Sequence, residues 1–145
     1  MCMKVNSFMT KHIVTVTMDD KVSHVKYLFD EHEFHHLLVV DRGNLSGVLS
    51  DRDLLRVLSP DVDSLDATSR DLACLKKMVH QIMTRNPITL HQDASIRDAI
   101  DVLNQHPISC LPIVNDAGKA VGIVTWRDLI RMLARPAEPK VESAE

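Results

Sequence analysis

The residues in this sequence that could do chemistry are the hydroxyl and carboxylate side chains of a motif that occurs twice. The motif is Gly-apolar-apolar-Ser/Thr-x-x-Asp, and it occupies residues 47–53 and 122–128. An apolar run ending at a hydroxyl residue predicts a strand that leads into a helix. The start of a helix offers free backbone N–H groups and a positive dipole end, which suit phosphate, and an ionised carboxylate can accept hydrogen bonds from both hydroxyls of a ribose. The pattern therefore predicts a nucleotide site formed by Ser50, Asp53, Thr125 and Asp128.

The same spacing has a second interpretation. Ser-x-x-Asp and Thr-x-x-Asp are variants of the helix capping box, in which the hydroxyl accepts from the third helical amide and the acid reaches back to the cap residue. Finding the motif twice does not decide between the two interpretations, because an internal duplication copies a helix cap as readily as it copies a binding site. Nucleotide binding and helix capping both remain open at this point.

The arginines next to the motif acids are further candidates. Arg52 and Arg127 directly precede the motif acids and could bind phosphate through a bidentate fork. The alternative is that they are solvated arginines in the first helical turn, as most charged side chains are exposed. Arg56 and Arg131, four residues later, are expected to face solvent.

The motifs lie within an internal repeat whose offset is 74 residues at first, so that Phe8-Met9-Thr10 returns as Ile82-Met83-Thr84, and 75 residues from the turn at 41–43 onward. Each copy reads as strand, helix, strand, strand, helix from its apolar periodicity, which predicts an α/β (α+β) fold of two packed repeats. We expect repeats at 5–58 and 79–134, a linker and lead-in helix at 59–78, and a mobile tail at 135–145. Pro112 lies inside a predicted strand and is expected at its start or at a sheet edge. The predicted strands are 13–16, 37–40, 45–50, 87–90, 111–114 and 120–125; the predicted helices are 22–32, 51–58, 96–106 and 126–134.

Composition narrows the class of protein. The 145 residues suffice for one compact domain, and a net charge of −3 without a basic run argues against a nucleic-acid platform. No stretch approaches ~18 apolar residues, so no membrane span is expected. Three isolated cysteines without a CxxC pair fit a reducing compartment. These features predict a soluble, cytoplasmic protein.

The order of the motifs resembles the CBS domain, named after cystathionine β-synthase. The resemblance rests on Met-Thr, an apolar-Thr-apolar strand, a helix, Leu-Pro-Ile-Val at 111–114 and Gly-Ile-Val-Thr-Trp-Arg-Asp-Leu at 122–129. It covers about residues 5–58 and 79–134. It implies a CBS pair, or Bateman module, in which two β-α-β-β-α units pack with pseudo-twofold symmetry and bind an adenosyl ligand such as AMP, ADP or ATP in the clefts between them.

The resemblance also implies roles for individual residues. Asp53 and Asp128 would bind ribose, and Ser50 and Thr125 would approach the phosphate side. The remaining positions that it assigns to the ligand are Thr15 and Thr89 on the first strands, and His35, His36, Ser109 and Cys110 just before the apolar second strands.

The two clefts are expected to differ. One presents imidazoles and the other a hydroxyl and a thiol, while Leu38 stands where the second repeat has Pro112. This predicts two related sites of unequal affinity. The segment Glu31–His36 contains metal-ligand residue types, but it crosses a helix end into a strand, so its side chains should diverge and we expect no metal site.

No arrangement of residues supports catalysis, so we expect a protein that is not an enzyme and requires no cofactor. The leading hypothesis is a regulatory module that binds an adenine nucleotide and acts as an energy or metabolite sensor, passing its output to a homodimer or a regulated partner protein. The alternative is a structural or interaction module that dimerises through its helices without a physiological ligand.

Overall fold

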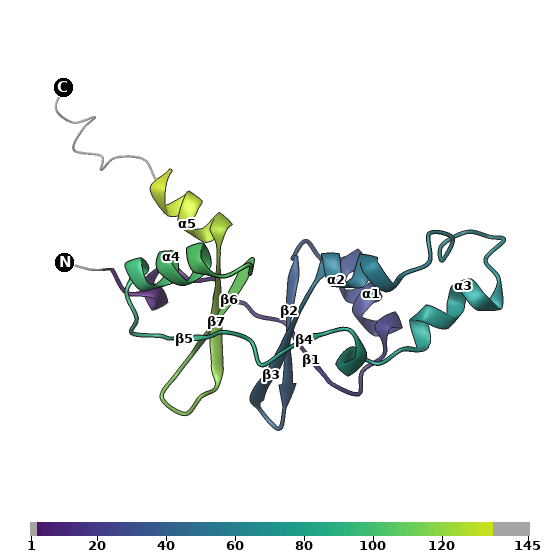
Figure 1. Cartoon of the computed structure of the whole chain (residues 1–145), viewed down its shortest axis with the longest axis horizontal. Helices are drawn as coiled ribbons and strands as arrows, with labels where there is room; N and C mark the ends of the chain where they lie inside the picture. The colour runs from purple at the N-terminus through teal and green to yellow at the C-terminus, as the bar shows by residue number, and fades with distance from the viewer. Residues whose placement is uncertain (1–2, 135–145) are drawn as a thin grey trace.

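Two small mixed sheets, one from each repeat, form the centre of the protein (Figure 1). The computed structural model describes residues 3–134. Its first half contains the elements η1 (Val5–Ser7), β1 (Thr15–Thr17), α1 (Val22–Glu31), β2 (His36–Asp41), β3 (Asn44–Ser50) and α2 (Asp51–Val57). Its second half contains α3 (Ser69–Ala73), η2 (Cys74–Lys76), η3 (Val79–Gln81), β4 (Thr84–Arg85), β5 (Leu90–His91), α4 (Ile96–Gln105), β6 (Cys110–Val114), β7 (Ala120–Thr125) and α5 (Trp126–Leu133).

The strands are ordered β1-β2-β3-β4 in the first sheet and β5-β6-β7 in the second. In each repeat the first strand runs parallel to the second, which runs antiparallel to the third. The tandem α/β fold predicted from the sequence is therefore confirmed. Each sheet packs on its own aliphatic core, centred on Leu37 and Leu49 in the first repeat and on Leu111 and Val124 in the second.

The segments that lead into the two repeats are exchanged. Val5 is fully buried in the core of the second repeat, and Thr10 forms a bridge with Ile123. Conversely, Val79 is fully buried in the core of the first repeat, where β4 pairs with β3. Each repeat therefore needs the lead-in of the other to complete its core, so the two chain segments fold as one unit.

The motif glycines make room for these exchanged segments. A Cβ atom on Gly122 would lie 2.9 Å from the carbonyl oxygen of Thr10, and one on Gly47 would lie 2.7 Å from the carbonyl oxygen of Thr84. Both distances are shorter than real Cβ contacts, so a side chain here would displace the lead-in. The glycine that begins each motif therefore has a packing role.

Pro112 does not lie at the edge of its sheet, contrary to expectation, because β6 is the central strand. In the first repeat, the backbone N–H of Leu38 donates to the carbonyl of Val14 at 3.1 Å. Pro112 has no N–H for the equivalent bond. Accordingly, β5 pairs with β6 only from Leu90 and Ile113 onward, one residue later than the corresponding pairing of Thr15 with Leu38.

The lead-in helix predicted within residues 59–78 is short, and its continuation toward the second repeat is interrupted. Lys77 and Met78 are extended between η2 and η3. The Lys77 carbonyl accepts from the N–H of Val22, and Val79 donates to the carbonyl of Asp20. These bonds hold the segment against α1 and allow Val79 to enter the first core, which outweighs the local helical pattern. Within residues 3–134, no helix has the length and apolar character needed to cross a bilayer.

Candidate functional site

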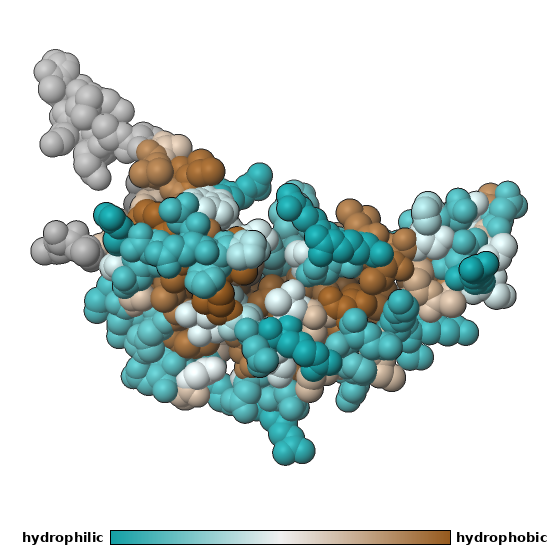
Figure 2. Space-filling view, in the orientation of Figure 1, coloured by the Kyte–Doolittle hydropathy of each residue, from teal (hydrophilic) through white to brown (hydrophobic). Residues whose placement is uncertain are grey.

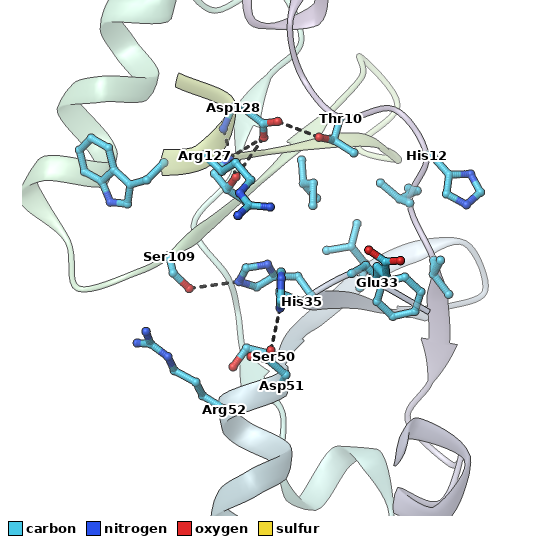
Figure 3. A pocket seen from close by; sticks show the side chains of 18 of the residues that line it. Thr10, His12, Glu33, His35, Ser50, Asp51, Arg52, Ser109, Arg127 and Asp128 are labelled. Atoms are coloured by element: carbon cyan, nitrogen blue, oxygen red, sulfur yellow. Dashed lines mark hydrogen bonds and ion pairs between the residues drawn. The ribbon is translucent and has the colours of Figure 1, made fainter. Parts of the chain in front are cut away.

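A cleft of about 570 Å³ lies between the two repeats (Figure 3). This volume falls within the roughly 300–1,000 Å³ that is usual for small-ligand sites. Apolar side chains from both repeats form part of its wall, including Val14, Leu38 and Ile123. Its polar lining comes from the lead-in before β1, the loop before β2, the starts of α2 and α5, and the loop before β6.

In the second repeat, the motif forms a capping box at the start of α5. The N–H of Thr125 donates to Oδ2 of Asp128 at 2.8 Å, and the N–H of Asp128 donates to the Thr125 hydroxyl oxygen at 3.4 Å. The hydroxyl of Thr10, from the exchanged lead-in, donates to Asp128 Oδ1 at 2.8 Å. Asp128 is buried, with 8% of its surface exposed, and it lines the cleft.

In the first repeat, the motif forms the equivalent capping box at the start of α2. The N–H of Ser50 donates to Oδ2 of Asp53 at 2.9 Å, and the N–H of Asp53 donates to Ser50 Oγ at 3.1 Å. Arg56 approaches the other carboxylate oxygen of Asp53 at 3.5 Å. Ser50 lines the cleft, whereas Asp53 lies outside its lining.

Helix capping is thus confirmed for both motifs. The same box occurs at Thr68–Asp71 before α3 and at Ser95–Asp98 before α4, and neither of these lines the cleft. Capping alone is therefore no evidence of a ligand. It does not preclude one either, because an ionised carboxylate has about four lone-pair sites.

His35 and His36, at the cleft wall, form hydrogen bonds with different partners. His36 Nε2 lies 3.1 Å from the hydroxyl oxygen of Ser109, which belongs to the other repeat. His35 Nδ1 lies 2.8 Å from Oδ2 of Asp51, whose N–H donates to the His35 carbonyl at 3.0 Å. Burial lowers the pKa of His36, the nearby His35 and Arg52 lower it further, and Asp51 and Asp53 oppose this. His36 is therefore largely neutral near pH 7.

The cleft is lined by equal numbers of arginine and carboxylate side chains. Arg52, Arg127 and Arg131 line it, together with the carboxylates of Glu33, Asp51 and Asp128. The expectation that Arg131 faces solvent was incomplete, because this exposed side chain also borders the cleft. Its position one helical turn after Arg127 places both on one face of α5 and could have indicated this. The three guanidinium groups make the cleft suitable for an anion.

Eight of the twelve predicted site residues line this cleft: His35, His36, Ser50, Arg52, Ser109, Thr125, Arg127 and Asp128. Of the other four, Thr15 and Thr89 are exposed elsewhere, and Asp53 caps α2. Cys110 is buried, and this burial, with a smaller contribution from Asp128, raises the pKa of its thiol to about 12. Sequence reasoning did not select the lining residues Thr10, His12, Glu33, Asp51 and Trp126, which lie in the lead-in, the loop and the variable motif positions.

The histidine-rich segment before β2 does not converge on a metal. His32 stacks on Phe34 with ring centroids 5.4 Å apart, while His35 and His36 have separate partners. In the part of the chain that the structure describes, no group of three or more His, Cys, Asp or Glu side chains is placed to hold a metal ion.

Comparison with known proteins gives a consistent result. The profile of the CBS domain matches residues 5–60 and 79–135. A CBS domain-containing protein of Dictyostelium discoideum is 30% identical over 140 residues, which cover 93% of this chain and 94% of that protein. An L-aspartate semialdehyde sulfurtransferase of Methanocaldococcus jannaschii is 28% identical over 129 residues, 88% of this chain, but the match spans only 23% of that enzyme.

Solved structures share the fold. The CBS domain pair of protein MJ0100, in complex with 5′-methylthioadenosine and S-adenosyl-L-methionine, is 28% identical, with a TM-score of 0.74 over 91% of this chain and all of that one. CBSX2 in complex with AMP is 29% identical, with a TM-score of 0.70 over 90% of this chain and 95% of that one. A further structure, of CBSX2 from Arabidopsis thaliana, is 27% identical, with a TM-score of 0.74 over 94% of this chain and all of that one.

Proposed function

This chain belongs to the CBS domain family, and we propose that it is a regulatory module that binds an adenosyl nucleotide in the cleft between its two repeats. The observation that carries the proposal is the convergence of the two motifs. Ser50 to Arg52 and Thr125 to Asp128, whose equivalent positions are 75 residues apart in sequence, line one cleft. The enzymes among its relatives match only in their CBS region, so the family resemblance supports regulation and not catalysis.

The chemistry of the cleft fits a nucleoside phosphate. Arg127 and Arg131 on α5, with Arg52 on α2, provide positive charge for phosphate. Asp128 retains lone pairs for ribose hydroxyls beside its bonds to Thr10 and Thr125. Trp126 and Phe34, both at the cleft, offer flat apolar surfaces against which a purine ring can stack.

The relatives give independent support. MJ0100 is seen with 5′-methylthioadenosine and S-adenosyl-L-methionine, and CBSX2 is seen with AMP, so their ligands share the adenosyl group. We assign an adenosyl ligand, of which AMP, ADP and ATP are the first to test. The mechanism that we propose is a change in how the two repeats pack, because a ligand that binds one packing arrangement better increases the population of that arrangement.

The proposal is tested by thermal denaturation with AMP, ADP, ATP and S-adenosylmethionine. A ligand present at about 100 times its dissociation constant should stabilise the protein by about 2.7 kcal/mol. Arg127→Gln should reduce the affinity for AMP, whereas Arg70→Gln, on the exposed surface of α3, should leave it unchanged. The absence of a shift with every adenosyl compound would contradict the proposal.

A second function, self-association, is favoured by an exposed apolar surface. Leu55 on α2 is 69% exposed, and Ile130 and Leu133 on α5 are 61% and 80% exposed. Leu55 and Ile130 occupy equivalent positions in the two repeats, and Figure 2 shows apolar surface over α5 and near α2. We propose a homodimer through these helices; light scattering should show that Leu55→Ser with Ile130→Ser converts it to a monomer. A dimer that persists in the double variant would exclude this surface as the interface. We also propose, as a separate point, a cytoplasmic location.

A further inference from the structure

The hydrogen bond between His36 and Ser109 joins the two repeats across the cleft. His36 Nε2 lies 3.1 Å from Ser109 Oγ, and both side chains line the cavity; Ser109 is labelled in Figure 3. Neither helix capping nor the packing of either core uses this contact. An anion that enters the cleft therefore meets a polar link that spans the space between the repeats.

A bound phosphate would require the His36 imidazole to act as a hydrogen-bond donor. An ionised phosphate oxygen can only accept a hydrogen bond, so the ring nitrogen that faces it must carry a proton, either in one neutral tautomer or in the imidazolium. A hydrogen bond between imidazolium and phosphate is roughly twice as strong as one between neutral groups. The neutral pair of His36 and Ser109 is thus weaker than the charged pair that phosphate would form with a protonated His36.

We propose that a phosphate-bearing ligand in this cleft binds together with a proton on His36, and that the imidazole exchanges its hydrogen bond to Ser109 for one to the phosphate. The proton comes from solution and adds to the ring nitrogen, and no covalent bond is made or broken. This inference deepens the proposed nucleotide function, because it requires that the ligand carry phosphate.

The electrostatics give the direction of the effect. In the free protein the pKa of His36 is lowered, chiefly by burial, and the negative charge of bound phosphate raises it again. Binding therefore takes up protons in the pH range between the two values, and affinity rises as the pH falls. The charged groups around His36 are His35, Asp51, Arg52 and Asp53 in its own repeat, His12 and Glu33 at the near cleft wall, and Arg127, Asp128 and Arg131 on α5.

The first test follows the imidazole protons of His36 by NMR from pH 5 to 8, with His36→Gln assigning its signal among the eight histidines. AMP should raise the pKa of His36 clearly, and pyrophosphate, which lacks the nucleoside, should also raise it. Binding of AMP with an unchanged His36 titration would overturn the inference and leave the nucleotide proposal intact. If pyrophosphate raises the pKa of His36 but adenosine and AMP do not raise it further, the nucleotide proposal alone is contradicted. A lack of response to every one of these compounds would overturn both.

The second test measures proton uptake directly. Calorimetric titration with AMP at one pH, in two buffers of different ionisation enthalpy, gives the number of protons bound. The AMP phosphate itself titrates near pH 6, so the difference between variants is the informative quantity. His36→Gln should remove up to one proton of uptake and reduce affinity several-fold, while His24→Gln, exposed on α1, should match the wild type. Equal uptake in all three proteins would overturn the inference.

Discussion

The two repeats carry the same motif, yet its two aspartates have different surroundings. Asp128 is buried, lines the cleft and accepts a hydrogen bond from Thr10 of the exchanged lead-in. Asp53 lies outside the lining of that cleft and faces Arg56. Because both form the same capping box, the local motif is the same and its neighbours account for the difference. Sequence symmetry therefore establishes a shared fold but not shared binding.

The residues before β2 and β6 differ in the same way. His36, the first residue of β2, lines the cleft, whereas Cys110, its equivalent at the start of β6, is only 6% exposed and lies outside the lining. Ser109, the equivalent of His35, reaches the same cleft from the opposite repeat. The cleft is thus bordered by unlike groups on its two sides. The unequal affinity of two related sites stays a prediction.

The largest effect should come from the feature that the repeats share most closely, the glycine of each motif. Gly122→Ala and Gly47→Ala would each push a Cβ against a backbone carbonyl of the exchanged lead-in. Overpacking of this kind costs about 1–3 kcal/mol, so urea unfolding should show a comparable loss in both variants. Asn104→Ala, exposed on α4, should change stability by less than about 0.5 kcal/mol. A variant as stable as the wild type would show that the lead-in is not held this closely.

The comparison of the two aspartates gives the next largest effect. Asp128→Asn preserves the shape of the cap but removes the charge that faces the cleft, and a hydrogen bond to a charged group is worth about 1.5–3 kcal/mol. The affinity for AMP in calorimetric titration should fall by at least about tenfold. Asp53→Asn, which makes the matching change outside the cleft lining, should alter affinity by less than about threefold. Equal losses in the two variants would place a ligand at both acids.

Much of the local structure could be predicted from the sequence, because it depends on short-range patterns. The helices at 22–32, 51–58, 96–106 and 126–134 end within one residue of those observed, since apolar periodicity and a hydroxyl cap act within one or two turns. The exchange of the lead-ins could not be predicted in this way. Val5 and Val79 occupy similar sequence contexts, and only the packed structure shows which core each one enters.

The candidate site was harder to predict than the fold. The Ser/Thr-x-x-Asp pattern occurs at four helix starts. Two of these, Thr68–Asp71 and Ser95–Asp98, do not line the cleft. The two motifs that do reach it are distinguished by the preceding Gly-apolar-apolar strand. Thr10 and Arg131 escaped selection because one comes from the exchanged segment and the other from a second helical turn.

A smaller effect is expected from the contact between the lead-in and the site. Thr10→Val removes the hydroxyl that donates to Asp128 and keeps the shape of the side chain. The loss of one such hydrogen bond to a charged group should cost about 1.5 kcal/mol, seen as a fall of a few degrees in melting temperature. Thr84→Val, the equivalent change at an exposed position on β4, should have little effect. If both variants melt alike, the lead-in does not support Asp128 through this bond.

The smallest change concerns Cys110, the counterpart of His36. Burial and the neighbouring Asp128 raise the pKa of its thiol to about 12, so the reactive thiolate is almost absent at pH 8. Iodoacetamide at pH 8 should leave Cys110 unmodified in the folded protein and modify it after unfolding in urea, as measured by mass spectrometry of its peptide. His36, half-buried at the equivalent position, has a pKa that burial lowers, so it gains a proton only below neutral pH, whereas Cys110 remains a neutral thiol both there and at neutral pH. Rapid labelling of folded Cys110 would mean that the second repeat opens at this strand.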